Sequence, residues 1–80
     1  TVSANNAINL KTIEENVAIW VSKGMATKKG KTILINLKEM GYNKLLGTGS
    51  ASQAYKLTVD AASANAVEKT MAAGGEVING

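Results

Sequence analysis

The charged side chains of this chain are better suited to holding an anion than to catalysis. Nine lysines stand against six carboxylates, no arginine is present, and the net charge is +3 with a pI near 9.3. The densest cluster is Lys28-Lys29-Gly30-Lys31. Lysine brings a point charge to a phosphate but lacks the planar fork with which arginine reads phosphate and guanine edges. The cluster is therefore either a solvated turn or a contact for a polyanion such as nucleic acid.

Several classes of reaction are excluded by residue types that the chain lacks. There is no histidine and no cysteine, so serine–histidine and cysteine–histidine nucleophiles, thiolate or imidazole metal sites and disulfides are ruled out. Glu14 and Glu15 are adjacent, and on a helix their side chains diverge by about 100°. Solvated surface positions are expected for all six carboxylates. We expect no enzyme, no metal, no cofactor and no small-molecule substrate.

The segment Gly47-Thr48-Gly49 invites comparison with phosphate-binding loops. The dinucleotide fingerprint needs a third glycine before a helix, and the P-loop needs Gly-Lys-Ser/Thr; neither pattern is met here. Two interpretations stay open. The glycines either permit positive φ between two strands or let the backbone approach an RNA phosphate closely.

The spacing of apolar residues predicts the elements that position these groups. Leu10 to Lys23 has helical periodicity, with Asn9 as N-cap, Gly24 at its end and a possible capping box at Thr12 and Glu15. A second helix, Ala64 to Ala73, is capped by Ser63, with Ala66, Val67, Thr70 and Met71 on its inner face. Strands are predicted at Thr32–Asn36, Tyr42–Leu46, Ala54–Asp60 and Glu76–Asn79, whereas Met25–Lys31 is predicted to be a turn. Leu37 to Met40 is expected to form a helical turn closed by Gly41.

These elements predict a small α+β fold, with two main helices packed on short strands around a single core in an irregular ββα-type layered arrangement. The whole chain, 1–80, is expected to form one domain. Trp20 lies on an apolar helix face and is expected in the core. Tyr42 and Tyr55 are expected to be half-buried, with stacking on a nucleotide as the alternative.

Two segments in this order resemble a known family. Gly41-Tyr42-Asn43-Lys44-Leu45-Leu46-Gly47-Thr48-Gly49 is followed by an alternating strand, a serine-capped helix and the run Val67 to Val77, which contains Ala72-Ala73-Gly74-Gly75. The order and spacing resemble the carboxy-terminal domain of large-subunit ribosomal protein fifteen, shared with archaeal and eukaryotic large-subunit ribosomal protein eighteen. The Gly41-Tyr42-Asn43-Lys44 form is more similar to the archaeal and eukaryotic members.

The chain departs from this family in two places. Family members usually carry basic residues after the Gly-x-Gly step, where this chain has Ser50, Ala51 and Ser52, and another after the capping serine, where it has Ala64. The family's long amino-terminal extension, rich in Gly, Lys and Arg, is missing from this sequence. The resemblance thus implies that the chain is the carboxyl-terminal part of a longer protein, and that it grips RNA less firmly alone.

The resemblance implies a structural constituent of the large ribosomal subunit, cytoplasmic and without a membrane span, that packs on ribosomal RNA and neighbouring ribosomal proteins. The alternative is a small protein-interaction module that binds no RNA. The residues expected to contact RNA are Lys28, Lys29, Lys31, Lys44, Gly47, Gly49 and Lys56.

Overall fold

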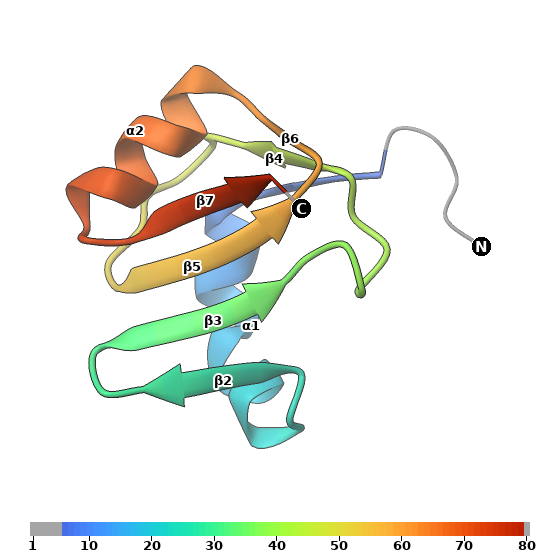
Figure 1. Ribbon diagram of the computed structural model, residues 1–80, viewed down its shortest axis with the longest axis vertical. Helices are drawn as coiled ribbons and strands as arrows, with labels where there is room; N and C mark the ends of the chain where they lie inside the picture. Colours follow the sequence, from blue (N-terminus) through green and yellow to red (C-terminus); the bar gives the residue numbers. More distant parts are fainter. Residues whose placement is uncertain (1–5, 80) are drawn as a thin grey trace.

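A computed structural model describes residues 6–79 and contains two helices and two small β-sheets (Figure 1). The expected α+β class is confirmed. The larger sheet has the strand order β2-β3-β5-β7 and the smaller one has the order β1-β4-β6. The bounds are β1 Ala7–Asn9, α1 Leu10–Ser22, β2 Ala26–Lys29, β3 Thr32–Asn36, β4 Lys44–Leu46, β5 Ala54–Val59, β6 Ala61–Ala62, α2 Ala64–Ala72 and β7 Glu76–Asn79.

Helix α1 begins at Leu10 as predicted and ends at Ser22, one residue before the predicted end, with Lys23 as its C-cap. The Asn9 side chain accepts a hydrogen bond from the Thr12 amide at 2.8 Å, and Gly24 follows the helix with φ +78°. The predicted capping box at Thr12 and Glu15 is wrong, because the Thr12 hydroxyl donates back to Asn9 at 3.0 Å. Leu10, Ile13 and Val17 are buried against the sheet, while Trp20 is only partly buried and packs on the edge of the core.

The register of the four-stranded sheet determines which face each side chain occupies. Strands β3, β5 and β7 are parallel, and β2 runs antiparallel to β3. Ile33, Ile35, Tyr55, Leu57 and Val59 are buried on the face that α1 covers. Because side chains alternate along a strand, the intervening residues form the opposite, outer face. Lys56 and Thr58 fall on that outer face, in agreement with the predicted alternation.

Strand β2 corrects the prediction that Met25–Lys31 is a turn. Ala26 to Lys29 pairs with β3, and only Gly30 and Lys31 connect the two strands. The segment is polar because it forms an edge strand with one buried residue, Ala26. Hydrophobic alternation, the usual sign of a strand, is therefore almost absent from it.

The smaller sheet was not predicted, apart from β4 at its centre. β1 and β6 both pair with β4 in parallel, over Ala7–Asn9 and Ala61–Ala62. Such short strands have no periodicity of their own, and two alanines have little intrinsic preference for a strand. Their pairing depends on tertiary placement around Leu45, which is completely buried.

Helix α2 confirms the predicted cap and corrects part of its predicted inner face. The Ser63 hydroxyl accepts a hydrogen bond from the Ala66 amide at 3.3 Å, and Ala66 and Thr70 are buried. Met71, predicted on the inner face, is 62% exposed. It follows Thr70 directly, so its side chain points about 100° away from the buried Ala66–Thr70 stripe.

Candidate nucleic-acid interface

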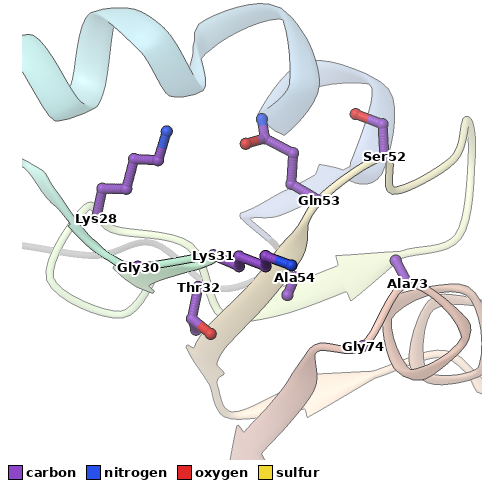
Figure 2. A pocket seen from close by; sticks show the side chains of 9 residues that line it. All are labelled: Lys28, Gly30, Lys31, Thr32, Ser52, Gln53, Ala54, Ala73 and Gly74. Atoms are coloured by element: carbon purple, nitrogen blue, oxygen red, sulfur yellow. The ribbon is translucent and has the colours of Figure 1, made fainter.

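Two of the predicted RNA-contacting lysines border a hollow at the end of the larger sheet where β3, β5 and β7 begin (Figure 2). We call this the strand-start hollow; its open volume is about 620 Å³. The residues around it come from the β2–β3 connection, the loop before β5 and the α2–β7 connection. They are Lys28, Gly30, Lys31, Thr32, Ser52, Gln53, Ala54, Ala73 and Gly74. Two of these nine residues are basic and none is acidic.

One wall of the hollow is fixed by hydrogen bonds to α1. Glu14 accepts a bond from the Ser52 amide, a second from the Ser52 hydroxyl at 2.9 Å and a third from the Tyr55 hydroxyl at 2.8 Å. Tyr55 is completely buried rather than half-buried as predicted, because Glu14 gives its hydroxyl a partner inside the fold. Glu14 is correspondingly tied into the structure and is not the freely solvated carboxylate that was expected.

This network changes the acidity of both titratable partners. Burial by itself would raise the pKa of Glu14, but the hydrogen bonds from Ser52 and Tyr55 outweigh it and hold the pKa below its ordinary value. Burial, together with the hydrogen bond and the negative charge of Glu14, raises the pKa of Tyr55 well above its ordinary value. Glu14 therefore stays ionised and Tyr55 stays neutral at physiological pH.

Lys29 and Lys56 lie on the outer face of the larger sheet, away from Lys28. Lys28 is opposite the buried Ile33 and shares its face, whereas Lys29 is opposite Thr32 on the other face. Lys56 is opposite Leu34 on one side and Glu76 on the other. A one-residue step along β2 thus separates the dense lysine cluster into two faces.

A shallow groove of about 320 Å³ runs along this outer face. We call it the outer-face groove; it contains one lysine, one carboxylate and several apolar side chains. Its residues are Gly24, Met25, Thr27, Leu34, Ile35, Asn36, Glu39, Lys56, Thr58 and Ile78. Its formal charge is balanced, unlike that of the strand-start hollow.

Lys44 is exposed at the first position of β4 and belongs to the smaller sheet. Lys44 and Lys56 do not lie on adjacent strands, because β4 and β5 belong to different sheets. Figure 1 shows β2 at one end of the long axis and β4 toward the other. Lys44 is thereby separated from the β2–β3 lysines.

Gly47 and Gly49 are required by close packing inside the chain. A Cβ atom at Gly47 would lie 2.7 Å from the Asn65 Cβ, and one at Gly49 would lie 2.7 Å from the Lys11 backbone nitrogen. Gly49 also has φ +88°, so the predicted positive φ holds there. The loop thus presses against the start of both helices, which gives its glycines a structural role without testing whether its backbone also meets RNA.

Lys69 is the residue that holds this loop, and sequence reasoning missed it. Its ammonium donates to the carbonyl oxygens of Gly47 and Gly49, at 2.7 and 2.6 Å. The carbonyl of Thr48 accepts from the Lys11 amide at 3.0 Å. Lys69 follows the loop by about twenty residues in the chain, and no local pattern connects the two.

Two other kinds of site are not found in the part of the chain that the structure describes. Residues 6–79 bring together no group of three or more metal-ligating side chains. Neither helix in that range is long and apolar enough to cross a bilayer.

Comparison with known protein sequences identifies relatives of this chain. The sequence profile of a family described as ribosomal proteins 50S-L15 and 50S-L18e, together with a 60S-subunit protein, matches residues 7–78. Large ribosomal subunit protein uL15 of Hyperthermus butylicus is 41% identical over 89% of this chain and 47% of the relative. The protein of the same name from Pyrobaculum arsenaticum is 44% identical over 88% of this chain and 45% of its own length.

A third relative, uL15 of Methanobrevibacter smithii, is 36% identical over 91% of this chain and 50% of the relative. The chain therefore spans about half the length of the curated relatives that it matches. Identity of this level across nearly the whole chain confirms the resemblance seen in the Gly41–Gly49 and Val67–Val77 segments, including its archaeal character. The chain belongs to the family of ribosomal proteins 50S-L15 and 50S-L18e and their 60S-subunit member.

Proposed function

We propose that this chain is a structural, non-catalytic part of the large ribosomal subunit, where it packs on ribosomal RNA and supports assembly of the subunit. The observation that carries the proposal is the family match over residues 7–78, whose members are named as ribosomal proteins. The absence of histidine and cysteine from the sequence agrees with a role that needs no catalytic group.

The chain is further proposed to be one domain, 1–80, forming the carboxyl-terminal part of a longer ribosomal protein. Two observations support this: its relatives are about twice as long, and its buried side chains form one core. Its place of action is then the ribosome in the cytoplasm.

The RNA contacts are proposed to come from lysine side chains and exposed backbone rather than from base-reading groups. Lys28, Lys29, Lys31, Lys44 and Lys56 are all exposed, and phosphate contacts by such point charges position a protein without specifying sequence. Gly47 and Gly49 remain predicted contacts through their backbone. The structure divides this set among three places. Lys29 and Lys56 lie on the outer face, where the groove has balanced charge, so we do not retain these two as RNA contacts.

Neighbouring ribosomal proteins are the second class of partner proposed. Met25 and Ile78 are 48% and 36% exposed and both border the outer-face groove, whose charge is balanced. Partly exposed apolar side chains around a groove are suited to contact with another protein. This feature also supports the alternative function, a protein-interaction module without RNA binding.

The proposal is tested by expressing the full-length protein with an affinity tag in an archaeal host and sedimenting ribosomal subunits through a sucrose gradient. We expect the tagged protein to co-sediment with the large subunit and to leave it when ribosomal RNA is digested. A protein that stays at the top of the gradient, or that remains with a protein complex after complete digestion of the RNA, would contradict the proposal.

A further inference from the structure

The strand-start hollow combines positive charge, hydrogen-bond donors and backbone access in one place. Lys28 and Lys31 supply two positive charges and Gln53 supplies a side-chain amide, whereas the Ser52 amide and hydroxyl already donate to Glu14. In Figure 2 the side chains of Lys28, Lys31 and Gln53 are arranged around the same space. Its volume of about 620 Å³ falls within the roughly 300–1,000 Å³ of ligand-binding pockets.

Small residues leave the backbone on the remaining sides of the hollow accessible. Gly30 has no atom within 4 Å of the position where its Cβ would be, and Ala54, Ala73 and Gly74 present at most a methyl group. The Ala73 and Gly74 amides already donate to the Lys69 and Met71 carbonyl oxygens, so the small side chains here provide room for an anion rather than free donors. The phosphodiester backbone of an RNA strand can therefore approach the hollow from the side of the β2–β3 connection.

The carboxylate nearest to this wall lies outside the hollow. Glu14 bonds to Ser52 and Tyr55 on the α1 side of the wall and is not among the residues that border the hollow. Its carboxylate stays charged, but its three hydrogen bonds are made to Ser52 and Tyr55 and hold Ser52 in a fixed position. Glu14 thus acts as a positioning residue for the wall.

Neither of the two hollows that contain Glu39 has this combination. The outer-face groove sets Glu39 against Lys56, and a smaller neighbouring hollow contains Glu39 with no lysine. A polyanion entering either would meet a carboxylate at close range. Repulsion at that range disfavours phosphate there and favours the strand-start hollow.

From this geometry we propose that the strand-start hollow binds the phosphodiester backbone of ribosomal RNA, with Lys28 and Lys31 neutralising phosphates and the Gln53 side-chain amide contributing a hydrogen bond. The inference rests on the proposed function and deepens it, because it selects one RNA-facing surface from the scattered lysines. Two point charges with no arginine hold phosphates without reading bases. The hollow is thus expected to recognise the path of an RNA backbone rather than its sequence.

The test is amine-reactive footprinting of the full-length protein, read out lysine by lysine by mass spectrometry. The protein is labelled free, bound to ribosomal RNA, with 10 mM inorganic phosphate, and mixed with large-subunit proteins without RNA. We expect RNA to lower the reactivity of Lys28 and Lys31 at least about fivefold, while Lys29 and Lys56 change less than about twofold. The latter pair is the matched control because Lys29 is adjacent in sequence but on the other face.

Three results would overturn the inference. Lys28 and Lys31 could stay fully reactive on RNA, could be protected equally by inorganic phosphate, which indicates a free-anion site, or could be protected only by the ribosomal proteins. The proposed function fails separately, by loss of co-sedimentation with the large subunit. If the protein enters the large subunit while Lys28 and Lys31 stay unprotected, RNA binding by the hollow is refuted and the proposed ribosomal role is not.

Discussion

The strand-start hollow and the outer-face groove share strands β2, β3 and β5 but differ in chemistry. The hollow has two lysines and no carboxylate, whereas the groove sets one lysine against Glu39 and adds Met25, Leu34 and Ile78. Alternation along β2 contributes to the difference, because it places Lys28 at the hollow and turns Lys29 to the opposite face. A cluster that is continuous in sequence can therefore serve two surfaces with different partners.

The largest loss of folding stability is expected at the segment that connects the strand-start hollow with the outer-face groove. Gly75 precedes β7, whose Ile78 borders the groove, and follows Gly74, which borders the hollow. A Cβ at Gly75 would press into the Tyr55 backbone, 2.6 Å from its nitrogen. Because backbone of a central strand cannot move aside, Gly75→Ala is expected to cost about 3 kcal/mol. Chemical denaturation monitored by Trp20 fluorescence measures it.

Gly30→Ala is the matched control for that substitution. Gly30 has φ +61° with open space around it, so the change carries only the cost of a left-handed backbone, about 1 kcal/mol. If Gly75→Ala and Gly30→Ala lower stability equally, the close contact of Gly75 with Tyr55 adds nothing to the cost. That result would contradict the claim that packing between β5 and β7 supports both the hollow and the groove.

A smaller effect is expected from Tyr55→Phe, which disturbs the hollow and spares the groove. The change removes the hydroxyl that donates to Glu14 and is expected to destabilise the fold by about 1.5 kcal/mol. The backbone amides of Ser52 and Gln53 should then exchange hydrogen faster, whereas the exchange rate of the Leu34 amide, in the groove, should not change. Faster exchange at both places, or at neither, would contradict a local role for this network.

The same network predicts how stability depends on pH. The folded-state pKa of Glu14 lies below its unfolded value of 4.5, so its contribution is present above pH 4.5 and is lost as pH falls through the lower folded value. The pKa of Tyr55 is raised above its ordinary 10.0, so ionisation of the unfolded chain lowers stability above pH 10. Unfolding midpoints across pH 2–11 for the wild type and Glu14→Gln measure this, and an unchanged acid limb in Glu14→Gln would refute the assignment.

Lys69 borders neither the hollow nor the groove, and Lys69→Met is expected to lower the free energy of unfolding by about 1 kcal/mol. Its ammonium is engaged by the carbonyl oxygens of Gly47 and Gly49, so removing it loosens that loop. RNA binding by the hollow should keep its salt dependence, because Lys69 bonds to the glycine loop and is not among the residues that border the hollow. A reduced salt dependence in Lys69→Met, measured by filter binding, would instead place the glycine loop in the RNA interface.

Much of the fold can be predicted from sequence. Both helices have helical periodicity and capping residues, and the strands around Ile33 and Leu57 have apolar patterns typical of strands. Strands β1, β2 and β6 cannot be predicted in this way. β2 is a polar edge strand with two lysines, and β1 and β6 are only three and two residues long, so none shows the alternation that reveals a buried face. The site divides in the same way. The lysines are visible as residue types, but their distribution between two faces depends on the register of β2. The Glu14–Ser52–Tyr55 and Lys69–loop contacts join distant segments and follow only from tertiary structure.

The central claim is that RNA is held by the hollow and not by the outer sheet face. Its most direct test is the salt dependence of ribosomal RNA binding by the full-length protein, for the wild type, Lys28→Gln/Lys31→Gln and Lys29→Gln/Lys56→Gln. All four lysines are exposed, so both double variants should fold with stability within about 0.5 kcal/mol of wild type. Each remaining difference in binding then reports on contact with RNA.

For Lys28→Gln/Lys31→Gln we expect about tenfold weaker binding and a slope of log K against log salt that is shallower by roughly 0.7 to 0.9 per lysine. For Lys29→Gln/Lys56→Gln we expect less than a twofold loss and an unchanged slope. An outer-face variant that loses as much affinity and slope as the hollow variant would contradict the account.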